Sequence, residues 1–141
     1  MNDDFPSCAR TYATLCFYGD SLDPDAITNA LGIGPTRSVR RNDARKRGSK
    51  TIIAKTGAWL LTSDEQLDSK DVQSHIRWIL QRVAGRLGEV TRLPEVETAR
   101  IFCFWSSVHG NGGPAISSAT LKLLAQHDID LDFDVWLDPR P

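Results

Sequence analysis

The stretch Leu131-Asp132-Phe133-Asp134-Val135-Trp136-Leu137 alternates between two sets of side chains without interruption. A period of two is typical of a β-strand that has one face on a core and the other face open. Leu131, Phe133 and Val135 are therefore predicted to pack under a helix expected over 71–87. The opposite face is predicted to carry a row of three carboxylates and an indole, formed by Asp130, Asp132, Asp134 and Trp136.

The rest of the chain is predicted to alternate between strands and helices. Asp23, Pro24 and Gly32 have the positions of a helix N-cap, a first helical residue and a C-terminal stop. A single apolar stripe predicts a second helix over 71–87, and Ser117 or Ser118 begins a third that runs to Ala125. Strands are predicted over 10–19, 37–41, 52–54 with 57–62, 99–106 and 130–137.

This order, β-α-β-β-α-β-α-β, predicts an α+β fold. Its first six elements match a ferredoxin-like split βαβ unit, with an added helix and strand. We expect a mainly antiparallel sheet with helices on one face, so that the acidic row lies on the uncovered face. At 141 residues the chain has the length of one domain. Residues 1–9 are expected to be a flexible leader and 10–141 a single domain.

Charge and cysteine content limit the classes of function. The net charge of −1 gives no global attraction to nucleic acid or to a membrane surface. No apolar run approaches the roughly 18 residues that a membrane span needs, and the N-terminus lacks the pattern of a signal peptide. Three widely spaced cysteines form neither a disulfide framework nor a metal or redox pair. A cytosolic protein is therefore expected.

Several short blocks of sequence resemble a bacterial family known as domain of unknown function 4279. The order and spacing of these blocks carry the likeness, which covers about residues 10–137. They are Tyr12-Ala13-Thr14-Leu15 with Gly19-Asp20, Ile27-Thr28 with Leu31-Gly32, Pro35-Thr36, Gly57-Ala58-Trp59, Ile79-Leu80, and Ile129 to Asp134. The resemblance implies a small bacterial α+β domain. It supplies no activity and no catalytic residues.

The row Asp130, Asp132 and Asp134 has the spacing of a calcium loop but not its other residues. Val135 and Pro141 stand where such a loop needs glycine and glutamate. Carboxylates on one face of a strand are about 6.6 Å apart, so an exposed row is tolerated without a metal. A solvated face, a surface for a basic partner or ligand, and a metal site are the three interpretations of the row. A catalytic metal is not expected.

Other candidate residues lie outside the last strand. The basic run 37–50, with Arg40, Arg41 and Arg45, is interpreted as a solvated loop or as a contact for an acidic surface. It contains no aromatic residue to stack on a base, so nucleic acid is not the expected partner. Trp78 lies off the apolar stripe of its helix, where it covers a neighbouring loop or contacts a second copy of the chain in a homodimer. Of the histidines, His109 lies in a glycine-rich loop without a neighbouring nucleophile, while His75 and His127 are expected at the surface or at its boundary.

The sequence thus favours a non-enzymatic cytosolic binding module, of the immunity type, that needs no cofactor. Its partner is expected to be a protein with a basic surface. The binding face is predicted to consist of Asp130, Asp132, Asp134 and Trp136 together with Tyr12 and Tyr18 on the first strand. The alternative is a small metal-assisted enzyme that uses the same three aspartates with His109.

Overall fold

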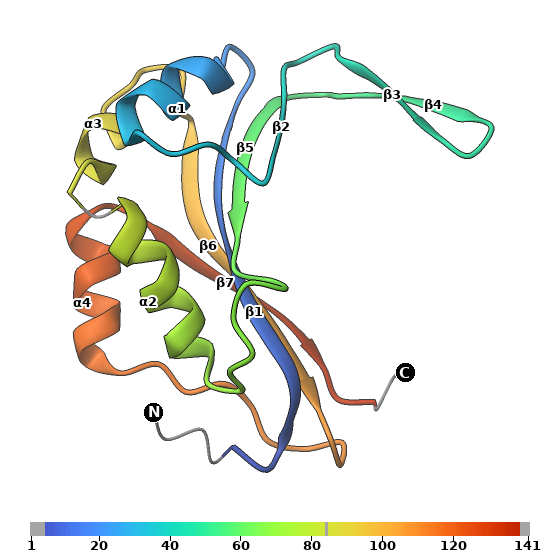
Figure 1. Ribbon diagram of the computed structural model, residues 1–141, viewed down its shortest axis with the longest axis vertical. Helices are drawn as coiled ribbons and strands as arrows, with labels where there is room; N and C mark the ends of the chain where they lie inside the picture. The colour runs from blue at the N-terminus through green and yellow to red at the C-terminus, as the bar shows by residue number, and fades with distance from the viewer. Residues whose placement is uncertain (1–4, 84, 139–141) are drawn as a thin grey trace.

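A computed structural model describes residues 5–83 and 85–138 of the chain. Its main layer is a five-stranded sheet with the strand order β2-β5-β1-β6-β7 (Figure 1). Its strands are β1 (Cys8–Gly19), β2 (Arg37–Val39), β5 (Gly57–Thr62), β6 (Thr98–Ser107) and β7 (Asp130–Trp136). A separate hairpin of β3 (Ala44–Arg47) and β4 (Lys50–Ile53) projects from one end of the sheet.

The sheet is mixed, which corrects the expectation of a mainly antiparallel one. The pairs β2–β5, β5–β1 and β1–β6 are antiparallel, but β7 runs parallel to β6. A helix lies between β6 and β7 in the sequence, and this crossover returns the chain to the end of the sheet where β6 began. The α+β class itself is confirmed.

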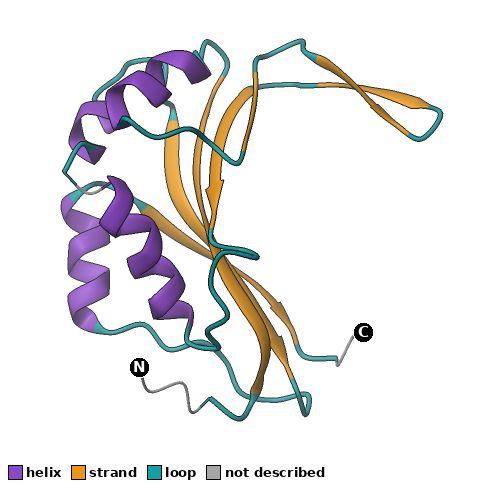
Figure 2. Ribbon diagram, viewed as in Figure 1, coloured by secondary structure: helices purple, strands orange, loops and turns teal. Residues whose placement is uncertain are grey.

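The helices lie together on one side of the sheet (Figure 2). They are α1 (Pro24–Leu31), α2 (Val72–Val83), α3 (Leu87–Thr91) and α4 (Ser118–Gln126). The Asp23 carboxylate accepts a hydrogen bond from the Asp25 amide at 3.1 Å, and Gly32 ends α1 with a φ of 73°. The predicted helix over 71–87 is too long, because α2 ends at Val83 and Leu87 begins the short helix α3.

The core lies between this helical layer and the sheet. Ala13, Leu15 and Phe17 of β1 alternate toward it, and the Phe17 ring lies 5.7 Å from that of Trp59 on β5, centroid to centroid. The indole nitrogen of Trp59 donates to the Thr28 hydroxyl on α1 at 3.1 Å, so the largest core side chain has its one polar atom satisfied. Burying each large apolar side chain stabilises the fold by about 1.5–3 kcal/mol.

The apolar face of β7 is only partly covered, which corrects a second expectation. Leu131 packs against the core, but the side chains of Phe133 and Val135 are 42% and 41% exposed. Both lie on the core side, since Phe133 pairs with the buried Cys103 on β6. However, β7 is an edge strand whose second half runs away from the helices (Figure 1). Only the first half of the strand therefore contributes to the core.

Candidate binding surface

One face of the sheet, which we call the open face, carries no helix among the described residues (Figure 2). Strand alternation and the pairing register determine which side chains it presents. The central rows combine aromatic and charged groups from three adjacent strands. They are Arg10, Tyr12 and Tyr18 of β1, Arg100, Phe102 and Phe104 of β6, and Asp130, Asp132, Asp134 and Trp136 of β7.

An aromatic pair and an arginine form the middle of the open face. Tyr12 and Phe104 are direct cross-strand partners, and their rings stack with centroids 5.1 Å apart and planes 15° apart. The guanidinium carbon of Arg10 lies 5.4 Å and 5.8 Å from the two ring centroids. One nitrogen of Arg10 is also 2.8 Å from both carboxylate oxygens of Asp64. Stacked rings capped by an arginine are a rigid arrangement whose residue types are enriched in protein interfaces.

The acidic row is shared with an arginine that the sequence interpretation overlooked. Arg100 binds the Asp132 carboxylate at 2.8 Å, and its guanidinium carbon lies 4.9 Å from the Tyr18 ring centroid. Asp130 and Asp134 make no ion pair within the described part of the chain. The row therefore presents a neutralised carboxylate, Asp132, with one available carboxylate on each side of it. The alternation of β6 would have placed Arg100 on this face, next to Asp130 in the register.

Burial suppresses the ionisation of the phenol and thiol groups on the open face. Partial burial raises the pKa of Tyr12, and the carboxylates of Asp64 and Asp134 act in the same direction. Burial also raises the pKa of Tyr18 and of the Cys16 thiol that lies between these tyrosines on β1. These groups are thus neutral near pH 7, where the thiol is not a nucleophile and the phenols are hydrogen-bond donors.

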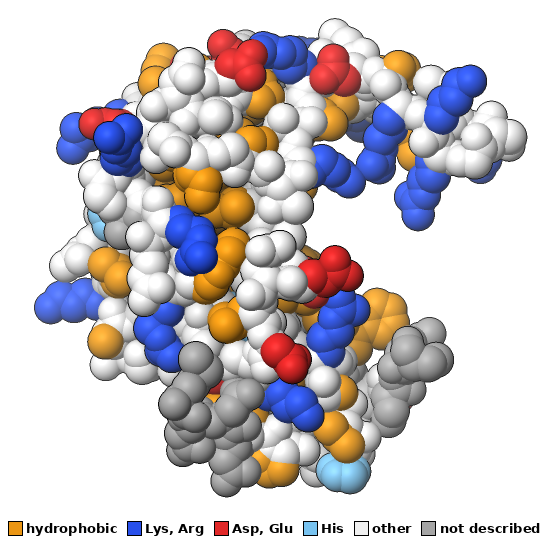
Figure 3. Space-filling model, in the orientation of Figure 1, with side chains coloured by type: hydrophobic (Ala, Val, Ile, Leu, Met, Phe, Trp, Pro, Cys, Tyr) orange, Lys and Arg blue, Asp and Glu red, His pale blue; other side chains and the backbone are white. Residues whose placement is uncertain are grey.

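The basic run does not join the acidic row, and it forms a hairpin instead of a loop. Arg40 lies 2.8 Å from an Asp23 oxygen and 3.0 Å from an Asp25 oxygen, so it fastens the base of the hairpin to α1. Arg41 lies 3.7 Å from Asp20, whereas Arg45 faces a pocket beneath the hairpin. Figure 3 shows blue side chains along the hairpin and a hollow between it and the rest of the molecule.

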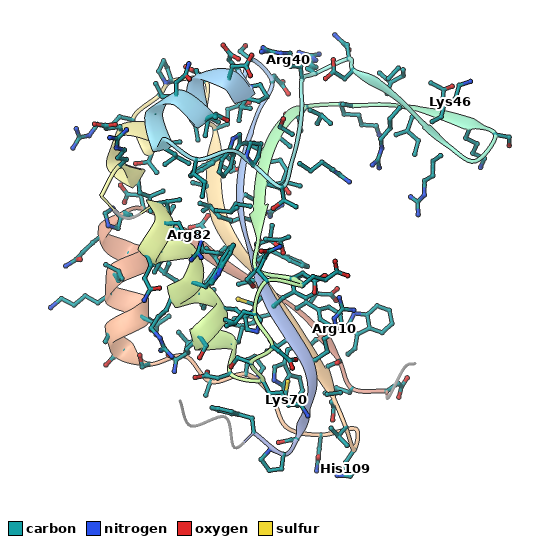
Figure 4. The ribbon with its side chains drawn as sticks, viewed as in Figure 1. Arg10, Arg40, Lys46, Lys70, Arg82 and His109 are labelled. Carbon is teal, nitrogen blue, oxygen red and sulfur yellow. The ribbon has the colours of Figure 1, made fainter. Side chains whose placement is uncertain are left out.

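The predicted metal-assisted site is not assembled in this structure. His109 lies in the loop that follows β6, at the end of the sheet opposite the hairpin (Figure 4). Across residues 5–83 and 85–138, no group of three or more His, Cys, Asp or Glu side chains is arranged to hold a metal ion. The positive charge of Arg100 on Asp132 also opposes binding of a cation by the row.

A buried serine–histidine pair is the feature that the sequence interpretation missed. His75 was expected at the surface or its boundary but is 1% exposed, because Ser63 and Ser69 supply polar partners inside the protein. Its Nδ1 is 2.7 Å from the Ser63 hydroxyl, and its Nε2 is 2.7 Å from the Ser69 carbonyl oxygen. The carbonyl can only accept, so Nε2 donates to it, and Nδ1 is the ring atom that shares a hydrogen bond with the Ser63 hydroxyl. Full burial of both side chains excludes a substrate, and the pair links α2 to β5.

Trp78 is half-buried on α2 and packs against the edge of the core. The guanidinium carbon of Arg82, one turn later, lies 3.7 Å from its ring centroid. Arg82 also donates to the Trp78 carbonyl oxygen at 2.7 Å. One face of the indole is therefore covered by its own helix, and the surface left for a second chain is small.

With this geometry in hand, comparison with protein-family models gives a match over residues 9–138 to the family described as Domain of unknown function (DUF4279). The match spans nearly all of the sequence, so the chain belongs to this family. Comparisons with curated proteins and with solved structures gave no match. None of the described helices is both long enough and apolar enough to span a lipid bilayer.

Proposed function

We propose that this member of the DUF4279 family is a non-enzymatic binding module that holds another protein against its open face. The observation that carries the proposal is the stack of Tyr12, Phe104 and Arg10 on a sheet face that no described helix covers. Aromatic and arginine side chains supply much of the binding energy at protein interfaces.

The acidic row determines the charge of the proposed partner. Asp130 and Asp134 lie on the same face as the aromatic stack and have no ion-pair partner among the described residues. A basic surface on the partner would complement them and would also compete with Arg100 for Asp132. Charges at the rim of an interface mainly raise the association rate, so binding should be fast and sensitive to salt.

A comparison of two acid-neutralising variants tests the proposal. The partner is first captured from a lysate of the source organism, and its binding kinetics are then measured at low and high ionic strength. Replacing Asp130, Asp132 and Asp134 with Asn should slow association by about tenfold at low salt and leave the melting temperature nearly unchanged. The matched control replaces the exposed acids Glu89, on α3, and Asp128, just after α4.

A third variant challenges the choice of surface. Neutralising Arg40, Arg41 and Arg45 should have a smaller effect than neutralising the acidic row. If the arginine variant loses the partner while the aspartate variant retains it, the basic hairpin is the contact surface and the proposal is wrong. If Tyr12→Ala also leaves affinity unchanged, the aromatic stack is not part of an interface.

Three further expectations belong to the same proposal. A ferredoxin-like ancestry of the first four sheet strands is supported by the order β2-β5-β1-β6 and by their antiparallel pairing. A cytoplasmic location is supported by the three cysteines, which are buried and not joined in disulfides. A bacterial immunity-type role, in which the protein neutralises another protein by binding, would fit an accessible face without catalytic groups.

A further inference from the structure

A pocket of about 520 Å³ lies where the β3–β4 hairpin meets the sheet, and neither the acidic row nor the aromatic stack contributes to it. It occupies the recess beneath the basic hairpin (Figure 3). Its walls come from β2, β3, β4, the connection to β5, and Tyr18 of β1. The lining residues are Tyr18, Arg37, Val39, Asp43, Ala44, Arg45, Ile52, Ile53, Ala54, Lys55, Thr56 and Ala58.

The pocket has an apolar floor. Ile52 lies on the same face of the hairpin as its cross-strand partner Arg45 and is half-buried, whereas Ile53 points to the opposite face, is 51% exposed and only borders the pocket. Val39 and Ala58 are direct partners across β2 and β5 and continue this floor onto the sheet. An organic group lying here would remove isoleucine surface from water, which favours binding.

Three cations surround the floor. Arg37, Arg45 and Lys55 have no carboxylate partner among the residues that the structure describes. The acid in the lining is Asp43, and its carboxylate already accepts a hydrogen bond from the Arg40 backbone at 2.7 Å. The pocket thus has an excess of positive charge, whereas the chain as a whole carries a net charge of −1.

Hydrogen bonds at the base of the hairpin hold the pocket in shape. The Asn42 amide donates to the Ala54 carbonyl oxygen at 2.8 Å, and the Ala54 amide donates to the Asp43 carbonyl oxygen at 2.9 Å. Arg40 then ties this base to the two carboxylates at the start of α1. A ligand would therefore meet a largely formed site and would lose little affinity to ordering of the chain.

We propose that this pocket binds a small organic anion with an apolar body, of the class of medium-chain or aromatic carboxylates. Arg37 and Arg45 would bind the carboxylate through charge-assisted hydrogen bonds, and Ile52 and Val39 would contact the apolar body. The volume falls in the range of small-molecule sites. The site borders the open face, since Tyr18 lines it, but it shares no residue with the acidic row or with the stack of Tyr12, Phe104 and Arg10.

Octanoate is a suitable probe, with the ¹⁵N-labelled full chain observed by amide chemical shifts at low ionic strength. Shifts are expected at Ile52, Ile53 and Ala58. The Arg37→Gln/Arg45→Gln variant should bind octanoate about tenfold more weakly, the size expected for losing a charged contact. The matched control is Lys46→Gln, which removes the same charge from the opposite face of β3, outside the pocket lining. Lys55→Gln gives a second test if the double variant fails to fold.

Two smaller probes separate the parts of the proposal. Acetate carries the charge without the apolar body, and octyltrimethylammonium carries the same chain with the opposite charge. Both should bind more weakly than octanoate. Equal binding of acetate, equal binding of octyltrimethylammonium, or equal losses in Lys46→Gln and the double arginine variant would each overturn the proposal.

An acidic peptide that contains leucine tests whether the bound carboxylate belongs to a small molecule or to a protein segment. If the peptide shifts the pocket amides and octanoate does not, the site recognises a protein segment and the small-molecule proposal is wrong. The Asp130→Asn/Asp132→Asn/Asp134→Asn variant should keep its octanoate affinity. This result separates the pocket from the acidic row, so either proposal can fail alone.

Discussion

His75 bonds through both nitrogens of its ring in the interior: Nδ1 joins α2 to Ser63 at the end of β5, and Nε2 joins it to Ser69 in the connection before α2. Ser63, which it contacts, also accepts a hydrogen bond from the Ala13 amide at 3.0 Å in the centre of β1. Two polar side chains and the middle of β1 thus depend on one another. In a low-dielectric interior, loss of one partner leaves the others unsatisfied.

His75→Ala should therefore destabilise the protein by about 2–4 kcal/mol, because it creates a cavity and removes the ring donor of the Ser69 carbonyl. The free energy of unfolding is measured by urea denaturation. His109→Ala, at an exposed histidine, is the control and should change stability by less than about 0.5 kcal/mol. Equal stabilities of the two variants would mean that the buried pair contributes nothing to the fold.

Arg100 illustrates why the candidate site could be predicted only in part. Tyr12, Tyr18 and the three aspartates were assigned to one face from the alternation of their own strands, and the register places them on one face. The partner of Asp132, however, depends on which strand lies beside β7. That neighbour is fixed by packing far along the chain, so the ion pair with Arg100 could not be deduced from the spacing of the acids.

At the scale of elements, β7 shows how far local patterns extend. Its alternation correctly predicts a strand and the side to which Phe133 points, since both follow from backbone geometry. Coverage of that side depends on the length of the helices above it and on the position of β7 at the sheet edge. By contrast, α1 was predicted fully, because Asp23, Pro24 and Gly32 act within a few residues of the helix ends.

Two phenylalanine variants measure how much more stability comes from a fully buried strand position than from the partly exposed β7. Phe17→Ala, in the fully buried part of β1, should lower the free energy of unfolding by about 3–5 kcal/mol. Phe133→Ala should lower it by roughly 1 kcal/mol, because nearly half of that side chain is already in water. The melting temperatures should differ accordingly. A loss from Phe133→Ala as large as that from Phe17→Ala would mean that a further part of the protein covers β7.

At the scale of the whole molecule, burial holds several thiol and phenol groups in their neutral, protonated form. The strongest case is Cys103 in the core, where burial raises the thiol pKa from 9.0 to about 12. Burial also raises the pKa values of Cys16, Tyr12 and Tyr18. In each case the folded protein holds its proton more tightly than the unfolded chain, so the shifts all have the same sign for stability.

The protein should therefore lose stability in alkali. The contribution of Cys103 is fully present below pH 9.0, the ordinary pKa of the thiol, and is lost as the pH rises toward about 12. Urea denaturation in a reducing buffer at about pH 8 and about pH 11 measures the loss. Cys103→Ala should show a smaller difference between the two pH values. If both proteins lose the same free energy, ionisation of this thiol does not contribute.

The chain enters and leaves the β3–β4 hairpin at a single place, since Asn42 and Ala54 are joined by a backbone hydrogen bond at its base. Everything between these two residues can therefore be exchanged, lengthened or removed without altering the path of the sheet strands. In evolutionary and engineering terms, it is a cassette inserted between β2 and β5. A library of sequences grafted between Asn42 and Ala54 could change which ligand the pocket binds, while the five-stranded sheet and its helices stay the same.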